Sequence, residues 1–330
     1  MIRVGILGCG RIARTMSKTL LQMQEEGIHL AAFASRTESK ARQYADEYHA
    51  EKAYGSYEAL ASDPDIDLIY IATPHSEHFE NAKLCLTHGK HVLLEKAFTT
   101  NHRLTEELCH LAEEKGLLLA EAIWTRYMPS RKILSDILAD KPVGEPYYLS
   151  ANLGYPISHK ERLMDPALAG GALLDVGIYP LNFASMVFGD DYQEVHAHCT
   201  YTKKGVDETD VFTLIYQDGK LADLNCSMVA QTDRRGIIYC SKGFIEVDNI
   251  NNPLLVRIYD QSYKPIKTIE MPKQINGYEY EVREVRDAIL NHQTECSSMP
   301  HAQTILMMKL MDDIRKKMNL IYPFERNRNQ

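Results

Sequence analysis

Residues that can transfer protons occur at two places where the surrounding pattern would hold them for chemistry. Glu95 and Lys96 follow a short apolar run that predicts a buried strand, and ligands bind outside the carboxyl ends of such strands. Asp175 and Tyr179 lie four positions apart within the apolar stretch 170–188, so a helix there places both on one face. Buried polar side chains require partners or a cavity. Lys96, Asp175 and Tyr179 are therefore candidate catalytic residues, against the alternatives of a solvated lysine and a core tyrosine.

A glycine-rich segment near the amino terminus has the spacing of a phosphate-binding loop. Gly8, Gly10 and Ala13 form the pattern G-x-G-x-x-A between the apolar run 2–7 and a helical stretch. The first glycine permits a tight turn, the second lets the backbone approach a pyrophosphate, and the small third residue lets the helix lie close to the sheet. The amino end of the helix directs N–H groups at the phosphates. The segment predicts a dinucleotide site formed by Gly8, Gly10, Arg11, Ile12 and Ala13. The alternative is a glycine turn that binds nothing.

The residues after the second apolar run decide which dinucleotide is preferred. NAD enzymes place Asp or Glu there to hold the ribose 2′-hydroxyl, but this chain has Ser35, Arg36 and Thr37. The Arg36 guanidinium can pair with a 2′-phosphate, and the neighbouring hydroxyls can donate to it. We therefore predict that Ser35 and Arg36 bind the cofactor and that NADP is preferred over NAD. The alternative is an exposed loop arginine without a ligand.

The elements that position these residues alternate between strand and helix over the first third of the chain. Short apolar runs predict buried strands, and the stretches between them predict helices. Such alternation implies right-handed crossovers and a doubly wound parallel sheet, so we predict a dinucleotide-binding Rossmann domain over residues 1–121. The predicted strands are 2–7, 30–34, 68–72, 91–94 and 117–120, and the predicted helices are 37–48, 76–88, 104–115 and a first helix that ends near 26.

After residue 121 the pattern changes to strands in succession. Asp218-Gly219 between two of them is a hairpin signal, and apolar and polar residues alternate over 221–228. We predict that residues 122–330 form an α+β domain for substrate binding and oligomerisation, built on a large open, mostly antiparallel sheet with helices on one side. The predicted strands are 146–153, 194–202, 210–216, 221–228, 236–240, 244–247 and 254–259, and the predicted helices are 129–138, 170–188, 278–291 and 302–318.

The open face of that sheet predicts self-association. Residues such as Tyr216, Met228 and Tyr239 would lie on it, and a contiguous apolar patch of this kind is a poor surface to leave in water. We therefore predict a homodimer, or a higher homo-oligomer, formed through this sheet.

The overall composition narrows the class of protein. The 330 residues are 45% apolar and 25% charged with a net charge of −8, a globular balance for two domains that argues against binding nucleic acid. No uncharged apolar stretch approaches the ~20 residues of a membrane helix, and the apolar run 4–9 is too short for a signal peptide. The seven cysteines are scattered and form no C-x-x-C pair, so we expect a cytoplasmic protein without a disulfide framework.

Two histidine pairs have spacings that occur in metal sites. They are His75-x-x-His78 and His88-x-x-His91. Neither has an obvious carboxylate that would complete a set of ligands, so we predict no metal. His78 is instead expected to line the cofactor cleft.

Five ordered segments resemble the Gfo/Idh/MocA oxidoreductases and span most of the chain. The segments are GCGRIA (8–13), IATPHSEH (71–78), GKHVLLEK (89–96), EAIWTRY (121–127) and GGALLDVGIYP (170–180). The second has His75 where the family's A-T-P-N-x-x-H pattern has Asn. The last two are most similar to the branch of the dimeric trans-dihydrodiol dehydrogenases, which is close to glucose–fructose oxidoreductase.

The resemblance implies hydride transfer between NAD(P) and a carbinol or carbonyl carbon of a sugar, a cyclitol or a dihydrodiol. It identifies Lys96 as the family's catalytic lysine, Tyr179 as the acid/base and Asp175 as the acidic residue of the motif. A nearby Lys96 and the oxidised nicotinamide would lower the pKa of Tyr179 from its ordinary value of ~10. The cofactor contacts that it implies are Thr73, Pro74, His75, His78, Glu95, Lys96, Trp124 and Arg126.

Two other functions on this scaffold remain alternatives. An NAD-dependent glycosidase would oxidise its sugar transiently and restore the cofactor, so hydrolysis without net cofactor reduction would identify it. A non-catalytic NADP-binding sensor would have no use for Lys96 and Tyr179, whose presence counts against it.

One position departs from the family's pattern. The proline that follows the family's lysine is Ala97 here, and we expect the family's Lys–Pro bond to be cis. A non-proline cis bond costs ~2.5–4 kcal/mol. We therefore predict that the Lys96–Ala97 bond is trans and that Lys96 is slightly displaced from the family's position.

Overall fold

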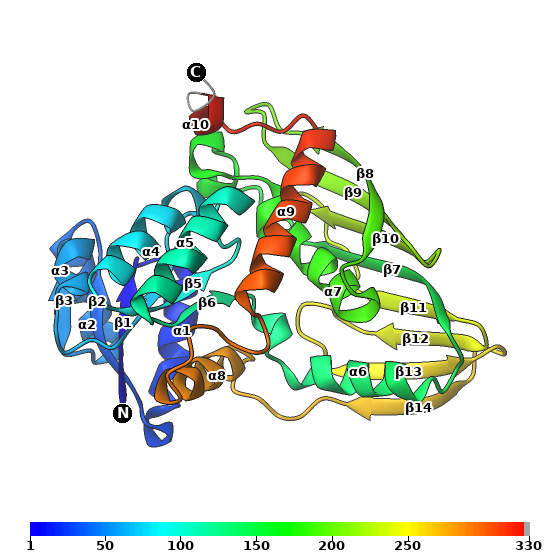
Figure 1. Cartoon of the computed structure of the whole chain (residues 1–330), viewed down its shortest axis with the longest axis horizontal. Coiled ribbons are helices and arrows are strands. Elements are labelled where there is room, and N and C mark those ends of the chain that lie inside the picture. The colour runs from blue at the N-terminus through cyan, green and yellow to red at the C-terminus, as the bar shows by residue number, and fades with distance from the viewer. Residues whose placement is uncertain (327–330) are drawn as a thin grey trace. The chain divides into compact units, whose positions relative to one another are not determined.

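The computed structural model describes residues 1–326, in two compact units (Figure 1). Unit 1 is built on a six-stranded parallel sheet, as the alternation of strands and helices predicted. The strand order is β3-β2-β1-β4-β5-β6, which reverses direction between β1 and β4, and ligands bind at the carboxyl ends beside such a reversal. The strands are β1 (Ile2–Leu7), β2 (Ile28–Ala34), β3 (Lys52–Tyr54), β4 (Leu68–Ile71), β5 (His91–Glu95) and β6 (Leu119–Ala122).

The helices of unit 1 begin and end where the sequence supplies caps. The Asn101 side chain accepts a hydrogen bond from the Leu104 N–H in the first turn of α5 (His102–Lys115), and Gly116 ends this helix in the left-handed conformation. In α1 (Arg11–Leu21) the amino end has no side-chain cap, because Gly10 stands there. The other helical segments are η1 (Gln24–Glu26), α2 (Glu38–Tyr48), α3 (Tyr57–Ala61), η2 (His75–Glu77), α4 (His78–Thr87), η3 (Trp124–Arg126), α8 (Glu279–Leu290) and α9 (His301–Lys317), which continues into unit 2.

Unit 2 is built on an eight-stranded, mostly antiparallel sheet, as the succession of strands predicted. Its order is β14-β13-β12-β11-β7-β10-β9-β8, and β7 and β10 form a parallel pair within it. The strands are β7 (Pro146–Gly154), β8 (Tyr192–Tyr201), β9 (Asp207–Tyr216), β10 (Leu221–Ser227), β11 (Gly236–Cys240), β12 (Gly243–Val247), β13 (Leu255–Asp260) and β14 (Pro265–Glu270). The helical segments are α6 (Pro129–Asp140), η4 (Glu161–Leu163), η5 (Pro166–Leu168), η6 (Leu173–Gly177), α7 (Ile178–Phe188) and α10 (Pro323–Arg326).

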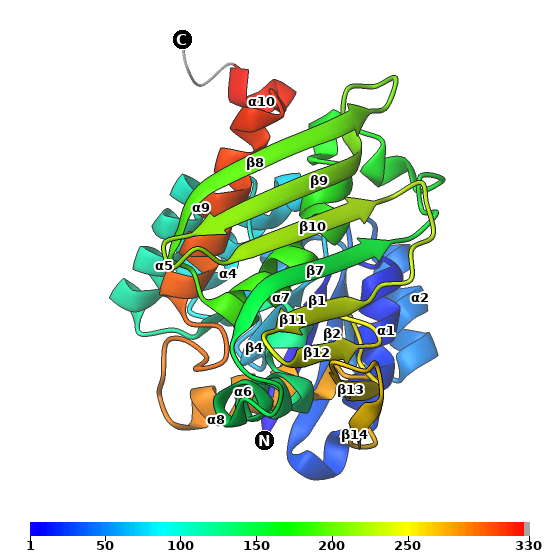
Figure 2. The ribbon, with the colours of Figure 1, turned by 90° about the vertical axis from the view of Figure 1, so that its right-hand side faces the viewer.

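The two faces of this sheet differ in burial. Inward-facing residues such as Phe212 and Leu224 are almost fully buried where η6 and α7 contact the strands. Figure 2 looks onto the opposite face, where the strands lie in front of α7. Tyr239 lies on this open face as predicted, but Tyr216 and Met228 are buried on the inner one. Alternation along a strand separates two faces without telling which one meets the core, so the prediction was wrong for these two residues.

The long apolar stretch is not one continuous α-helix. Instead of a helix over 170–188, a turn at Gly171 leads into the π-helical segment η6, and α7 follows. Pro180 explains the change, because it has no N–H to complete an α-helical hydrogen bond with Val176, and a wider turn accommodates this. Within the described residues, 166–188 is also the one helical segment long and apolar enough to span a membrane. Of its most apolar 18-residue stretch, 78% is buried inside the protein, which is typical of a core helix.

The peptide bond after the candidate lysine differs from the prediction. Lys96–Ala97 is cis, so the expected trans bond was wrong. The prediction considered only the cost within the peptide bond itself. The conformation also depends on the surrounding residues: Ala97 is fully buried, and its carbonyl oxygen lies 2.8 Å from the His78 Nδ1 atom.

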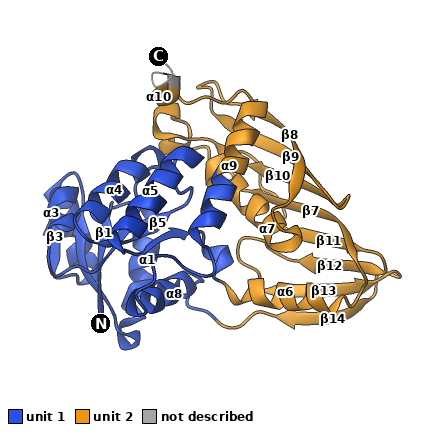
Figure 3. Ribbon diagram, in the orientation of Figure 1, with its two compact units in different colours: residues 1–127, 274–308 blue, residues 128–273, 309–330 orange. Residues whose placement is uncertain are grey.

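The division into units also differs from the predicted boundary after residue 121. Unit 1 comprises residues 1–127 and 274–308, and unit 2 comprises 128–273 and the segment from 309 on (Figure 3). The chain returns to unit 1 through α8, whose apolar residues, including Val282 and Val285, are buried there. Helical periodicity shows that a helix has an apolar face but not which sheet that face covers.

Candidate active site

The glycine-rich loop lies between β1 and α1, at the carboxyl end of the sheet of unit 1. Gly8 has φ +101°, and a Cβ there would lie 2.8 Å from the Ala72 carbonyl oxygen, so glycine is required. At Gly10 a Cβ would meet only that same oxygen, 3.9 Å away, so there is room beside this residue. Ala13 is fully buried. Its small side chain lets α1 lie close to the sheet.

This loop fits the diphosphate of a dinucleotide. The first N–H groups of a helix, here those of Arg11, Ile12 and Ala13, have no partner within the helix itself. No side chain caps the amino end of α1, so these groups remain available to an anion. The positive end of the helix dipole and the room beside Gly10 favour a phosphate at the same place.

Ser35 and Arg36 follow β2 at the same edge of the sheet. The Ser35 N–H donates to the Tyr54 carbonyl oxygen at 3.1 Å, which fixes the start of this segment. Arg36 is exposed and forms no ion pair with any residue in the range 1–326. Burial raises the pKa of the Tyr57 hydroxyl, and the charge of Arg36 opposes this shift. An exposed guanidinium in this position can receive a phosphate.

His78 joins the segments that follow β4 and β5. Its Nδ1 atom lies 2.8 Å from the Ala97 carbonyl oxygen, and its Nε2 atom lies 3.0 Å from the Thr73 carbonyl oxygen. The sequence predicted that this side chain lines the cofactor cleft, but its exposed fraction is 0%. A fully buried ring offers no surface to a ligand. His78 therefore acts on the site indirectly, because its two contacts hold the segments after β4 and β5 together.

The other predicted contacts after β4 are closer to the surface. Thr73 and Pro74 are half-buried, and Asn81 Nδ2 donates to Thr73 Oγ1 at 3.1 Å. The His75 ring is buried and packs edge-on against His78, with the ring centroids 5.7 Å apart. These contacts fix Thr73 and Pro74, which directly follow Ala72, the residue next to the Gly8 turn.

Glu95 and Lys96 stand at the carboxyl end of β5. The Tyr70 hydroxyl of the neighbouring strand β4 donates to Glu95 Oε1. Burial raises the pKa of Tyr70 well above its usual value, and the charge of Glu95 adds to this, so the hydroxyl keeps its proton. Glu95 is buried and thereby fixed, while Lys96 directly after it is half-buried.

Two buried carboxyl groups near Glu95 were not among the predicted site residues. Burial raises the pKa of Glu121 in β6 to about 7, although the nearby Thr304 hydroxyl and the charge of Arg126 oppose the shift. Glu281 in the first turn of α8 is fully buried, and its carboxyl oxygens have no hydrogen-bond partner among residues 1–326. Burial, with the charge of Glu95 adding to it, raises its pKa well above the usual range, which favours the protonated form. For Glu121 the available signal was a single acidic residue within the apolar run 117–124, whereas Glu281 stands among other charged residues and gave no such signal.

Trp124 and Arg126 lie in the short helical segment η3 after β6. The Trp124 ring stacks on Tyr278, with centroids 4.4 Å apart and planes at 15°. Arg126 is 4% exposed and its charge acts on the buried carboxyl group of Glu121. Tyr278 is thus a further residue of this site that the sequence did not indicate.

Asp175 and Tyr179 lie in unit 2. Asp175 belongs to η6 and is buried, and its Oδ1 accepts a hydrogen bond from the Arg162 guanidinium at 2.9 Å. Tyr179 is half-buried in the first turn of α7. Lys96, the third predicted catalytic residue, belongs to unit 1.

Models of known families match both parts of the chain. Residues 2–122 match a family described as an oxidoreductase family with an NAD-binding Rossmann fold, and residues 132–246 match the GFO/IDH/MocA C-terminal domain. The chain is 33% identical to trans-1,2-dihydrobenzene-1,2-diol dehydrogenase of Bos taurus over 99% of both chains. It is 31% identical to the human enzyme of that name over 98% of both chains.

A solved structure is similar over nearly the whole chain. It is a 3-ketoreductase from Actinomadura kijaniata in complex with NADP and TDP-benzene, with a TM-score of 0.89 and 26% identity. The alignment covers 96% of this chain and 98% of the other. The aldose-aldose oxidoreductase of Caulobacter crescentus, at 22% identity and a TM-score of 0.85, shares the fold.

Proposed function

We propose a specific reaction for this chain, which belongs to the Gfo/Idh/MocA oxidoreductase family and is an NAD(P)-dependent oxidoreductase. It transfers hydride between NADP and a CH–OH or carbonyl carbon of a sugar, a cyclitol or a dihydrodiol, with Tyr179 as the acid/base. One observation carries the proposal: Lys96 directly follows β5, at the edge of the parallel sheet where the Gly8–Ala13 loop also lies. Chemistry and phosphate binding thus share one edge.

The cofactor is held by residues along that edge. The amino end of α1, with Gly8, Gly10, Arg11, Ile12 and Ala13, binds the diphosphate, and Arg36 with Ser35 binds the 2′-phosphate of NADP. Support for NADP comes from Arg36, which has no acidic partner among residues 1–326, and from the related 3-ketoreductase, whose structure contains NADP. The remaining proposed contacts are Thr73, Pro74, His75, Glu95, Lys96, Trp124 and Arg126.

Lys96 and Tyr179 carry the proton transfer. When bound, the nicotinamide supplies the hydride for reduction and accepts it in oxidation. The Tyr179 hydroxyl gives its proton to the carbonyl oxygen of the substrate during reduction and takes the proton back during oxidation. The Lys96 ammonium polarises the same oxygen. Asp175, four residues before Tyr179, is held by its hydrogen bond from Arg162 and helps to position this segment. The related 3-ketoreductase has also been solved as variants of a lysine and of a tyrosine, the same two residue types.

Replacing Tyr179 by Phe tests this mechanism. The change keeps the ring and removes the hydroxyl, so turnover should fall by roughly 10²–10⁴, the usual contribution of a positioned general acid. The affinity for NADPH, measured by fluorescence titration, should stay within a few fold. Tyr216→Phe is the matched control, because Tyr216 is a buried tyrosine of the same unit outside the proposed site, and its turnover should not change. Near-normal turnover of the Tyr179 variant would transfer the role of proton donor to another group.

The substrate class is open to a direct screen. Dihydrodiols, aldoses and inositols are incubated with NADP and followed by the absorbance of NADPH, and net reduction of the cofactor with one class identifies it. Hydrolysis of a glycoside without net reduction would instead indicate the NAD-dependent glycosidase. Tight NADPH binding without turnover of any compound would favour the sensor. Lys96 and Tyr179, both present here, support the dehydrogenase.

We also propose that the open sheet face of unit 2 forms a homodimer. It carries a row of aromatic side chains: Tyr148 stacks on Tyr239 at 5.2 Å, and Phe244 stacks on Tyr259 at 4.6 Å. Tyr148 and Tyr239 are more than a third exposed. Light scattering should report the mass of two chains, and Tyr239→Glu should shift it towards one chain because a charge would be buried at the interface. A wild-type monomer at micromolar concentration would contradict the proposal.

The cysteines bear on the compartment. All seven are free thiols in the structure, and several are fully buried. Such thiols suit a reducing environment, so we place the protein in the cytoplasm.

A further inference from the structure

A β-bulge at the start of β9 brings two aspartates to the same face of the sheet of unit 2. Asp207 and Asp210 are three residues apart, so a regular strand would direct them to opposite faces. The pairing with β8 changes register between Thr200, opposite Thr209, and Tyr201, opposite Asp207. β9 therefore contains one extra residue at this point, and both carboxyl groups turn inward. Asp207 and Asp210 are each 0% exposed.

Asp207 binds the amino end of the segment that contains the candidate acid/base. Its Oδ2 accepts the Leu173 N–H at 2.6 Å. This N–H group stands at the start of η6, where backbone N–H groups lack partners within the helix. A Cβ at Gly171 would lie 2.0 Å from Asp207 Oδ1, so the turn before η6 can approach this carboxylate only because residue 171 is glycine.

Asp210 lies close to Asp207 on the inner face of the sheet, so the two charges act on each other. Its Oδ2 accepts from the Cys226 thiol, with a distance of 3.3 Å between Sγ and Oδ2. Two neighbouring carboxylates each disfavour ionisation of the other. Burial raises the pKa of both groups. The charge of Asp207 raises that of Asp210 further, while the Leu173 N–H opposes the rise at Asp207. The Leu173 N–H thus favours the ionised form at Asp207, while the charge of Asp207 favours the protonated form at Asp210.

We propose that Asp207 and Asp210 are positioning residues that set where η6 begins and thereby place Asp175 and Tyr179. The Asp207 carboxylate holds the Leu173 N–H at the positive end of the helical segment, Gly171 lets the turn approach that carboxylate, and Asp210 lies beside it on the same face. Asp175 is two residues and Tyr179 six residues after Leu173. A shift of about 1 Å in a reacting group can cost 10²-fold in rate. A small displacement of the start of η6 would therefore be enough to misplace the Tyr179 hydroxyl and lower the rate.

The proposal rests on the proposed role of Tyr179, and two measurements separate the two ideas. The first is the rate of backbone amide exchange over residues 172–179, which needs no substrate. The second is kcat and the KM for NADPH with the compound identified by the screen. Asp207→Asn removes the anion and should speed exchange over 172–179. It should also lower kcat at least tenfold while the KM for NADPH stays within twofold.

Asp210→Asn is the conservative rescue. The amide has no charge and can donate to the neighbouring Asp207 carboxylate, so exchange should stay slow and kcat should stay within threefold of the wild type. Val256→Ala is the matched control for a purely structural effect, because Val256 is a buried residue of the same sheet on β13. It should lower the melting temperature and leave kcat unchanged.

Three results would overturn the anchor. One is unchanged exchange over 172–179 in Asp207→Asn, the second is faster exchange without loss of kcat, and the third is an equal loss of kcat in Val256→Ala. Failure of the proposed function looks different. Tyr179→Phe would then retain its turnover, while the exchange rates of Asp207→Asn would still decide whether the carboxyl pair holds η6.

Discussion

Two lysines at opposite ends of β5 show how differently the two edges of the parallel sheet are built. Lys90 precedes the strand, is 8% exposed, and donates to the carbonyl oxygens of Asp63 and Ile66 at 2.5 and 2.8 Å. Lys96 follows the strand, is half-buried and stands next to Glu95. The same residue type is thus part of a backbone support at one end and of the candidate chemistry at the other.

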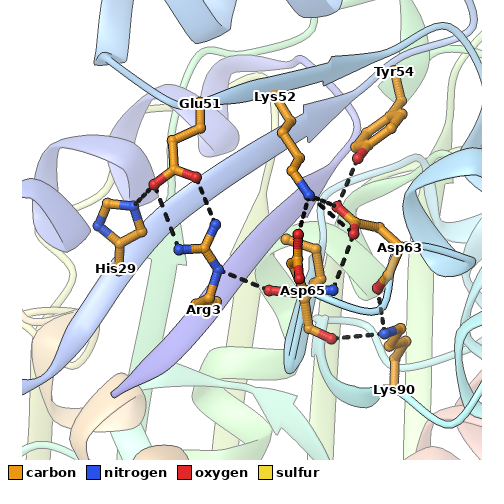
Figure 4. Close-up of polar contacts among 9 residues, drawn as sticks. Arg3, His29, Glu51, Lys52, Tyr54, Asp63, Asp65 and Lys90 are labelled. Carbon is orange, nitrogen blue, oxygen red and sulfur yellow. Dashed lines mark hydrogen bonds and ion pairs between the residues drawn. The ribbon is translucent and has the colours of Figure 1, made fainter.

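The surroundings of the two lysines extend this difference. At the amino edge, Arg3, Glu51, Lys52 and Asp63 form a network of hydrogen bonds and ion pairs (Figure 4). None of their buried side-chain atoms lacks a partner within residues 1–326. At the carboxyl edge, buried polar atoms without a hydrogen-bond partner in that range include Ser76 Oγ, Thr125 Oγ1 and both carboxyl oxygens of Glu281. Complete networks stabilise a fold by themselves, whereas incomplete buried ones are typical of ligand sites.

Exchanging each lysine for methionine tests this contrast with the largest expected effect. Lys96→Met keeps most of the side-chain volume and removes the charge, so turnover should fall by about 10²-fold or more, with some loss of cofactor affinity. Lys90→Met should retain turnover. It leaves the Asp63 and Ile66 carbonyl groups without their donor, which costs about 1–3 kcal/mol of the free energy of unfolding. Urea unfolding and initial rates of both variants would show the crossed pattern, and a Lys90 variant as inactive as the Lys96 variant would remove the distinction.

Two arginines, one at each edge of the sheet, should differ in the same way in their effect on cofactor binding. Arg36 is exposed after β2, and Arg36→Ala should weaken NADPH binding about tenfold, equivalent to ~1.4 kcal/mol, and leave NADH binding nearly unchanged. Arg3 at the amino edge pairs with Glu51 at 2.6 Å and donates to the Asp65 carbonyl oxygen at 2.8 Å. Arg3→Ala should therefore leave both affinities unchanged. Titration of the two cofactors measures this, and equal losses for NADPH and NADH in Arg36→Ala would show that another residue discriminates between them.

The amino acid pattern identified the parts of the molecule where local rules are sufficient. Buried runs such as 68–72 and the Gly8–Gly10 spacing predicted the parallel sheet and the loop after β1, because a strand covered on both faces is apolar along its length. β14 was missed because its residues are almost all exposed, so no apolar pattern marks it. The short strand β3 was missed as well, since its three residues are too few for a periodic signal.

The candidate site required contacts between distant residues that no local pattern contains. Lys96 could be predicted because its position after a strand is a local feature. The partners of the site could not, because Tyr278 stacks on Trp124 from 154 positions along the chain (278 − 124), and Asp207 reaches Leu173 across 34 positions. The inward turn of Asp207 also depends on a bulge, which is a property of the pairing between β8 and β9.

Asp63 at the amino edge is expected to affect stability and its dependence on pH, and not turnover. Burial alone would raise the pKa of Asp63, but hydrogen bonds from the Tyr54 hydroxyl, the Lys52 ammonium and the Asp65 N–H outweigh it and lower the pKa to about 2. A carboxyl group with a lowered pKa in the folded state stabilises the fold above its unfolded pKa of ~3.9. That contribution is about 2 kcal/mol at neutral pH and is lost as the pH falls from about 4 towards 2.

Asp63→Asn should therefore destabilise the protein by about 2 kcal/mol at pH 7, and the difference from the wild type should shrink as the pH is lowered through 4. Asp65→Asn is the matched control, because Asp65 pairs with the same Lys52 at 2.6 Å but its side chain is 62% exposed. An exposed ion pair contributes about 0–1 kcal/mol, so this variant should stay close to the wild type at every pH. Turnover of both variants should be unchanged, since neither residue lies at the carboxyl edge. Urea unfolding at a series of pH values measures the effect. A pH-independent loss in Asp63→Asn would mean that Asp63 stabilises the amino edge through its shape and hydrogen bonds alone rather than through its charge.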